Sequence, residues 1–409
     1  MSEYPYIVDA KLLGQSPIGT LVPISGYDPR AGRDYHANAY VPDDLPHNVE
    51  LTGSTHLAVA KAAAAVARAD QAAQQLPNPR LLVRPSIRRE AVSTSALEGT
   101  YAAFTDVLEA DFKDRAQLSA SVAEVLNYVH AAEEAIAWVG ERPITLALLQ
   151  HLQGILVQGT PSETRDAGRV RTTQVFIGLN SANVEDARFV PAPPDHRLRD
   201  GLLVWEGWIN GSQEIHTLVK MALGHYQFET LHPFNDGNGR LGRLVVILQL
   251  MAAGELQLPI LSLSPWLEVR RRAYQDHLLD VSVTGDYNPW VSFFCQAVEA
   301  QAHEAMRQVS GLIEIKQKFM DQLRSLRTKG VSLQIAEDLI GYPMLTVRDA
   351  AERYGVTYQA ANQAVAKLVE LGILQQRSEG NYGRIFACND VLRVMQLPPP
   401  PQQTILPVS

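Results

Sequence analysis

Apolar residues recur every three to four positions through much of this chain, and this spacing predicts a mainly helical fold. We expect helices at about 53–75, 86–95, 101–111, 119–139 and 144–158. The first is rich in alanine. In the last, Leu149, Leu152 and Leu156 share one face, and Gly159 is placed to end the helix. Helical spacing resumes ahead of residue 231 and continues to about 325.

Two stretches depart from this spacing. Residues 1–50 contain six prolines among many Gly, Asp and Tyr residues, which is typical of an extended arm with little regular structure. Within 168–195, β-branched and aromatic residues at 172–177 and 188–190 favour strands, with Gly178 and several asparagines between them. The simplest interpretation of the second stretch is a β-hairpin.

Residues 231–243 read Leu-His-Pro-Phe-Asn-Asp-Gly-Asn-Gly-Arg-Leu-Gly-Arg, and we call them the signature loop. Pro233 ends the preceding helix, because a residue before proline is disfavoured in the α region. Gly237-Asn238-Gly239 therefore lies at the start of the next helix, where free N–H groups and the helix dipole form an anion site. Arg240 and Arg243 lie on one face there and can hold β- and γ-phosphates as forks. The loop thus predicts a site for a nucleotide polyphosphate.

The other polar residues of the loop suit nucleotidyl transfer. His232 alone has an ordinary pKa near neutrality, so it is the candidate base for an attacking hydroxyl, with a structural histidine as the alternative. Asp236 suits Mg²⁺ shared with the phosphates, and its alternative role is a helix cap. Asn238 can donate its amide to the α-phosphate, while Gly237 and Gly239 let the backbone approach. Phe234 is expected to anchor the loop in the core.

Composition limits the setting. A chain of 409 residues with 46% hydrophobic and 20% charged residues predicts two or three globular domains. The net charge of −8 gives no general attraction to nucleic acid or to anionic membranes. Cys295 and Cys388 are expected to be buried free thiols in a reducing compartment. Without a secretory signal or a long apolar run, we expect a cytoplasmic protein with no membrane contact.

The segment 345–395 predicts a separate unit. Two short helices, of which the first is capped by Thr346 and Asp349, precede a hairpin around residues 379–383, which together indicate a winged helix. Six basic residues oppose five acidic ones there. Such a balance predicts only modest DNA affinity, so protein contact is at least as expected as DNA contact. The tail after Pro398 is expected to be disordered.

The signature loop resembles the motif HPFx(D/E)GNGRxxR of the Fic family at every position. The resemblance implies an enzyme that transfers AMP from ATP to a hydroxyl side chain of a protein with the help of Mg²⁺. It assigns His232 and Asn238 to catalysis and Asp236 to the metal. The residues that it assigns to the nucleotide are Gly237, Asn238, Gly239, Arg240 and Arg243. The segment from Gly168 through Arg171 and the predicted hairpin resembles the Fic flap, which is thought to align a target by strand addition.

A second segment, Thr94-Ser95-Ala96-Leu97-Glu98-Gly99, resembles the inhibitory (S/T)xxxE(G/N) motif of the same family. A carboxylate at a helix C-terminus opposes the dipole, so Glu98 needs a cationic partner. The resemblance implies that this partner is Arg243 and that Glu98 occupies the place of the γ-phosphate. In some relatives the same glutamate positions a water that removes AMP, and a solvated helix end is the remaining alternative. For Tyr274, adenine contact and buried packing both stay open.

These observations define five parts and one leading function. We expect an N-terminal arm and helical region with the inhibitory motif at 1–115, a Fic catalytic domain at 116–310 and a helical linker at 311–344. A winged helix at 345–396 and a proline-rich tail at 397–409 follow. The leading function is an autoinhibited protein adenylyltransferase acting on a target protein or on itself, and a homodimer is left open. The alternatives are a DNA-binding regulator or toxin–antitoxin-type module with a weak catalytic domain, or an enzyme that removes AMP.

Overall fold

The computed structural model describes residues 10–28, 32–140, 142–178, 187–212, 214–377 and 383–396. Most of them lie in helices, as the spacing predicted. At the centre is α9 (Asn238–Ala252), which is buried from Arg240 to Leu250. It contacts α3 (Val83–Leu97), α5 (Ala120–Val139), α6 (Leu146–Val157) and α8 (Thr217–Leu231). A helix buried on all sides belongs to the core of its domain, so the start of α9 is held in one place.

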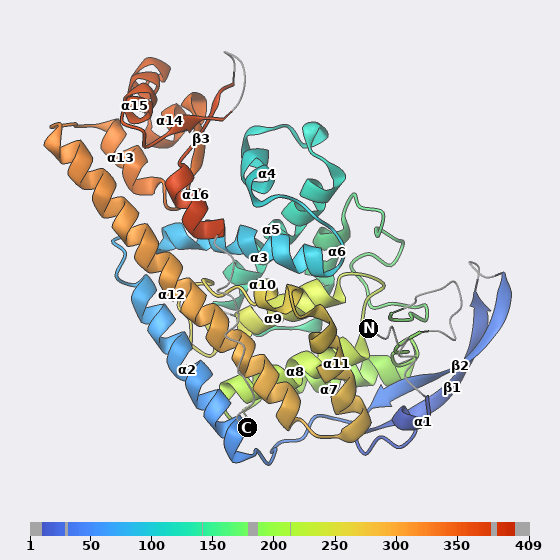
Figure 1. Ribbon diagram of the computed structural model, residues 1–409. Helices are drawn as coiled ribbons and strands as arrows, with labels where there is room; N and C mark the ends of the chain where they lie inside the picture. The colour runs from blue at the N-terminus through green and yellow to red at the C-terminus, as the bar shows by residue number, and fades with distance from the viewer. Residues whose placement is uncertain are drawn as a thin grey trace, which may run out of the picture.

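The remaining helices of this core surround α9. The longest pair, α2 (Gly53–Ala73) and α12 (Asn288–Ser325), runs side by side along one edge of the molecule (Figure 1). The others are α1 (Ala10–Leu13), α4 (Phe104–Glu109), α7 (His196–Asn210), α10 (Ser264–Glu268) and α11 (Arg271–Thr284). Short 3₁₀ turns lie at Pro79–Leu82, Ala110–Phe112 and Arg115–Gln117. The helices expected at 53–75, 119–139 and 144–158 are confirmed within a few residues as α2, α5 and α6.

The prediction of an irregular N-terminal arm is wrong for residues 19–28 and 33–42. Strands β1 (Gly19–Asp28) and β2 (Arg33–Pro42) form an antiparallel ribbon in which Gly19 pairs with Pro42 and Asp28 with Arg33. Prolines had pointed away from strands, but a two-stranded ribbon has outer edges on which a missing N–H costs nothing. The fully buried Tyr40 ties the ribbon to the core, since its hydroxyl contacts Ser16 Oγ at 2.9 Å.

The hairpin predicted within 168–195 is present only as a single bridge between Ile177 and Phe189. The expected turn at 179–186 lies outside the described residues. Some polar groups of this segment make hydrogen bonds other than those of a strand pair. The Val190 carbonyl accepts from the backbone N–H of Tyr40 in β2 at 2.8 Å. The side-chain amide of Gln174 donates to the Pro191 carbonyl at 2.9 Å. The segment therefore lies beside the N-terminal ribbon.

Residues 331–396 form a small helical unit with a three-stranded sheet of order β3-β5-β4. Its helices are α13 (Val331–Asp338), α14 (Val347–Tyr354), α15 (Tyr358–Glu370) and α16 (Asn389–Gln396), and its strands are β3 (Met344–Thr346), β4 (Gln375–Gln376) and β5 (Ile385–Ala387). The two helices and the flanking strands expected from the sequence are thus present. The hairpin tip, residues 378–382, lies outside the described chain.

This unit packs against α4 and the start of α3. Leu108 of α4 forms an apolar cluster with Met344, Ile385, Ala387 and Leu392. Polar contacts border the cluster. Arg377 pairs with Glu109, and Tyr342 is stacked by the guanidinium groups of Arg84 and Arg353. The helix that leads to the inhibitory motif therefore begins at this interface.

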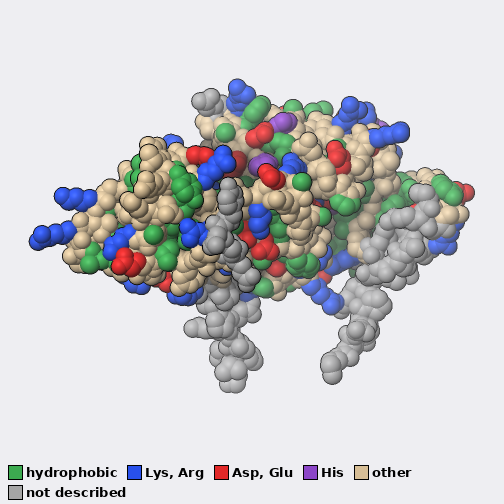
Figure 2. Space-filling view, turned by 90° about the horizontal axis from the view of Figure 1, so that it is seen from above, with side chains coloured by type: hydrophobic (Ala, Val, Ile, Leu, Met, Phe, Trp, Pro, Cys, Tyr) green, Lys and Arg blue, Asp and Glu red, His purple; other side chains and the backbone are tan. Residues whose placement is uncertain are grey.

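The surface and the cysteines give two simpler results. Acidic and basic side chains are interspersed over the face seen in Figure 2, so no large field of one sign covers it. Cys295 and Cys388 are free and buried, as predicted. No helix in the described ranges combines the length and the apolar character that a membrane span requires.

Leu108→Ala should lower the free energy of unfolding by about 2–5 kcal/mol, because it removes a 1% exposed side chain and leaves a cavity between α4 and the C-terminal unit. Denaturant unfolding of both proteins measures the difference. Leu203→Ala, at a 61% exposed position of α7, is the control and should change stability little. Equal unfolding free energies for Leu108→Ala and the parent protein would contradict this interface.

Candidate functional site

The signature loop leaves α8 through a left-handed residue, His232, with φ 51° and ψ 64°. The following Pro233 explains this, since it excludes the α region for the residue before it. His232 Nδ1 lies 3.3 Å from the Glu229 carbonyl, which can only accept, so Nδ1 carries the proton and Nε2 is the basic nitrogen. Burial, followed by the positive charge of Arg171, lowers the pKa of His232 to about 4. The imidazole is therefore neutral and ready to accept a proton at pH 7.

Arg171 holds the peptide backbone around His232. Its Nε donates to the His232 carbonyl at 2.8 Å, and its amide donates to the Pro233 carbonyl at 2.9 Å. Nη2 also donates to the Leu231 carbonyl at 3.3 Å. Burial lowers the pKa of Arg171 to about 10, so the side chain remains charged at neutral pH. Arg171 is thus a buried brace for the loop and comes from the segment that the sequence assigned only to the flap.

Asn238 braces the same loop from within. Its Oδ1 accepts from the Phe234 amide at 2.8 Å, and its Nδ2 donates to the Phe234 carbonyl at 2.7 Å. The side chain is 1% exposed, and Phe234 is fully buried. The sequence had assigned the Asn238 amide to the α-phosphate, whereas here the amide closes the loop. Gly237 has φ 88°, and a Cβ would lie 2.6 Å from Leu156 Cδ2, so glycine is required there.

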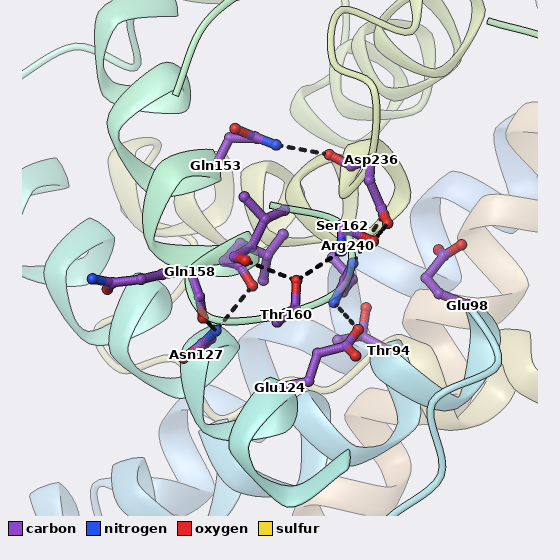
Figure 3. A network of polar contacts seen from close by, with 12 residues as sticks. Thr94, Glu98, Glu124, Asn127, Gln153, Gln158, Thr160, Ser162, Asp236 and Arg240 are labelled. Carbon is purple, nitrogen blue, oxygen red and sulfur yellow. Dashed lines mark hydrogen bonds and ion pairs between the residues drawn. The ribbon is translucent and has the colours of Figure 1, made fainter. Parts of the chain in front are cut away.

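Asp236 and Arg240 form one network, shown in Figure 3. Arg240 is 2% exposed and donates to Glu124 at 2.6 Å and to Asp236 at 3.0 Å. The second carboxylate oxygen of Asp236 accepts from the Ser162 hydroxyl, and its carbonyl accepts from Gln153 at 3.1 Å. Arg240, expected to hold phosphate, is therefore already paired with two carboxylates. Glu124 and Ser162 come from distant elements, and no sequence signal marked them.

Arg243 makes a separate set of contacts with the inhibitory helix. Its Nη2 lies 2.6 Å from Glu98 Oε1, and its Nε donates to Thr94 Oγ1 at 2.8 Å. Glu98 caps α3 just before Gly99, as the sequence predicted. Burial lowers the pKa of Arg243, but Glu98, Tyr274 and Glu229 together outweigh burial and raise the pKa above its ordinary value. The pair predicted from the family motif is present in the structure.

A cavity of about 170 Å³ connects these groups. Its polar lining includes Glu98, Arg243 and His232. Its apolar lining includes Ile177, Phe189, Leu278 and Leu279. The structure thus brings a neutral imidazole, a buried guanidinium and the N-terminus of α9 to one hollow with an apolar wall. Tyr274 also borders it, but its hydroxyl lies 2.7 Å from His225 Nε2 and the side chain is 5% exposed, which is the packing role.

Comparison with known proteins agrees with this geometry. Residues 56–137 match the model described as Fic/DOC family N-terminal, and residues 143–250 match the model of the Fic/DOC family. The chain is thus similar to the Fic/DOC family over these two segments, which we call the Fic region. Signature loop and inhibitory motif both lie within this Fic region. A solved Fic family protein from Desulfovibrio desulfuricans G20 has a TM-score of 0.54 at 22% identity, over 84% of this chain and 98% of that chain, which shows a common fold.

Two curated relatives match about a third of this chain. Protein adenylyltransferase fic-1 of Caenorhabditis elegans is 34% identical over 137 residues, which are 33% of this chain and 24% of the relative. Protein adenylyltransferase Fic of Culex quinquefasciatus is 32% identical over 136 residues, again 33% of this chain and 24% of the relative. The match thus spans about a quarter of the length of each relative.

Asn238→Ala should loosen the signature loop, because the buried backbone amide and carbonyl of Phe234 lose their hydrogen-bond partners. We expect a loss of about 1–3 kcal/mol in unfolding free energy and faster amide exchange at residues 234–238. Hydrogen-exchange mass spectrometry of this segment measures it. Asn288→Ala, at the half-buried first residue of α12, is a control that should leave the exchange of residues 234–238 unchanged. Unchanged exchange in Asn238→Ala would contradict the brace.

Proposed function

We propose that this protein is an adenylyltransferase that moves AMP from ATP to a hydroxyl side chain of a target protein or of itself. The observation that carries the proposal is the cavity in which the His232 imidazole and the Arg243 guanidinium face the start of α9. Two protein adenylyltransferases are similar to about a third of this chain. The apolar wall of the cavity suits the adenine ring, and its charged end suits phosphates.

In this mechanism the phosphates lie at the N-terminus of α9, where amides and the helix dipole favour anions. His232 Nε2 takes the proton of the attacking hydroxyl, whose oxygen then bonds to the α-phosphorus as the bond to pyrophosphate breaks. The Glu229 carbonyl holds the imidazole in the required tautomer. Arg243 binds the terminal phosphate once Glu98 leaves it. Arg240 holds Asp236 in position and also adds positive charge to the site. Asn238 holds the signature loop in position.

A magnesium ion fits beside Asp236. No cluster of three His, Cys, Asp or Glu residues exists in the described ranges, so a site made of protein groups alone is not expected. Mg²⁺ commonly binds one carboxylate together with substrate phosphates. The side chain of Asp236 is 38% exposed and offers such a carboxylate once its hydrogen bond from the Ser162 hydroxyl is broken. When bound, the ion would neutralise phosphate charge. Asp236 would hold it, and Gln153 would keep the Asp236 backbone in place.

The wild-type protein is proposed to be held inactive by Glu98. Its carboxylate occupies Arg243, and Thr94 adds a hydroxyl and a carbonyl acceptor at 2.8 and 3.1 Å. A γ-phosphate therefore has no free guanidinium to bind. This places the inhibitor in the same chain as the catalytic loop.

The C-terminal unit is proposed to be a winged helix that recruits a protein partner. Its Arg377 is already paired with Glu109, and Lys367 of α15 is paired with Glu370 at 3.0 Å, which lowers the positive charge available to DNA. DNA binding by α15 remains the competing role, and nanomolar binding of a defined duplex in physiological salt would favour it.

The protein is proposed to be cytoplasmic, because its free buried thiols, Cys295 and Cys388, suit a reducing compartment.

Glu98→Gly should activate transfer on the order of 30- to 150-fold, because the pair it removes favours the closed state by about 2–3 kcal/mol. The measurement is incorporation of labelled AMP into the protein itself and into lysate proteins. Glu98→Gly combined with His232→Ala is the inactive control, and Glu98→Gly combined with Arg243→Ala should lose most of the gain. Equal rates for the wild type and Glu98→Gly would contradict inhibition. A lower rate in the variant, with AMP removal also lost, would instead assign Glu98 to the hydrolysis that removes AMP.

In the Glu98→Gly background, Asp236→Asn should raise the Mg²⁺ concentration needed for half-maximal transfer by about tenfold or more, with recovery at high metal. Titration of MgCl₂ against transfer measures this. Asp276→Asn, on an exposed part of α11, is the matched control and should leave the curve unchanged. Identical curves with and without the Asp236→Asn change would mean that Asp236 serves only to anchor Arg240 and Ser162.

A further inference from the structure

Arg243 faces a second glutamate whose side chain the mechanism does not use. Glu229 lies in the last turn of α8, and its side chain is 13% exposed and lines the same cavity as Glu98 and Arg243. The two glutamates sit at two glycines of α9. A Cβ at Gly239 would collide with the Glu98 carboxylate, and a Cβ at Gly242 would lie 2.6 Å from Glu229 Oε1. Each glycine thus makes room for one carboxyl group beside Arg243.

The surroundings of Glu229 do not suit an ionised carboxylate. Its Oε1 is buried without a hydrogen-bond partner in the described part of the chain, and His225 Nε2 lies 3.9 Å away. The Tyr274 hydroxyl, which faces it from α11, is bound to His225 instead. A buried oxygen without a donor tolerates a neutral carbonyl far better than half of a negative charge. Arg243 is already neutralised by Glu98, so it gives Glu229 only partial relief.

We propose that Glu229 is a further nucleotide-contacting residue, which stays a neutral carboxylic acid with Oε1 against Gly242 and donates its hydroxyl to the phosphate held by Arg243. This inference rests on the proposed function. A carboxylate in this place would repel a polyphosphate, whereas a carboxylic acid adds a donor to it. The arrangement explains how a glutamate can share a wall with an anion site.

The protonation of the neighbours supports the proposal. Burial raises the pKa of Glu229 to about 7, with Arg243 lowering it and Glu98 raising it. Burial lowers the pKa of His225 to about 3 and that of His232 to about 4, and it raises the pKa of Tyr274 well above its ordinary value. Between about pH 5.5 and 8.5, Glu229 is therefore the group facing Arg243 that we expect to titrate. Above its pKa the free site has lost its proton, so ATP binding must take one up.

The test uses calorimetric ATP binding to the full-length Glu98→Gly protein with Mg²⁺, from about pH 5.5 to 8.5, in buffers of different ionisation enthalpy. We expect affinity to fall with rising pH, by up to about tenfold per unit above the pKa of the free acid, with uptake approaching one proton per ATP. Without Glu98, Arg243 favours the ionised form, so the fall should begin below pH 7. Adding Glu229→Gln, a permanently neutral donor, should keep the tight low-pH affinity at every pH and remove this proton uptake. The protonation of ATP itself changes with pH in the same way for both proteins, so it does not contribute to the difference between them.

Two variants separate this role from a structural one. Glu229→Ala should bind ATP more weakly than Glu229→Gln at all pH values, because it removes the donor. Gly242→Ala should also weaken binding, since its methyl group displaces the carboxyl, and should add little when Glu229 is already alanine. Glu134→Gln, with a 56% exposed side chain on α5, is the matched control and should not change proton uptake.

The outcomes distinguish the two proposals. If the Glu98→Gly protein binds no ATP and transfers no AMP, the proposed function fails. If it binds ATP with the same affinity profile and proton uptake whether residue 229 is Glu or Gln, only the role of Glu229 fails. If Glu229→Gln weakens binding at low pH as much as Glu229→Ala does, the neutral-acid form is overturned, because the amide mimics that form.

Discussion

The buried guanidinium of Arg243 is the constraint on which this site depends. It is 2% exposed, and a charge in such a place requires nearby acceptors, because an unpaired buried charge costs several kcal/mol. The end of α3 supplies them through Thr94 and Glu98. Side chains can approach because α9 has no Cβ at Gly239. Helices α3 and α9 are therefore joined by electrostatics, and in the proposed reaction ATP must supply acceptors in place of those that it displaces.

The two arginines of the signature loop, Arg240 and Arg243, make different contacts although they lie one helical turn apart. Arg240 joins α5 to the loop through Glu124 and Asp236, whereas Arg243 faces the cavity. Rigidity of the loop comes from side chain–backbone hydrogen bonds at Asn238 and Arg171. Because these bonds are buried, each is expensive to lose, which keeps His232 at one angle to the start of α9. Positioning of this kind supplies much of the rate in phosphoryl chemistry.

The C-terminal unit shares an interface with the segment that carries the inhibitor. Leu108 of α4 lies in its apolar cluster, and Arg84, near the start of α3, stacks on Tyr342. A Cβ at Gly341 would lie 2.8 Å from the Leu81 carbonyl, so the two parts pack at backbone distance. Helix α3 is thus held near its start by the C-terminal unit and at its end by Arg243.

The sequence by itself determined the helical class, the positions of the major helices and the residues of the Fic loop and inhibitory motif. These features depend on spacing and on contiguous residue types, which a linear pattern records. It did not reveal the β1–β2 ribbon, because prolines masked strands whose edges tolerate them. Nor did it reveal that Arg240 is already paired, that Asn238 closes the loop, or that Glu229 faces Arg243. Those roles come from contacts between α5, α8, α9 and the segment around Ser162, and only the packed tertiary structure decides which side chains are desolvated together.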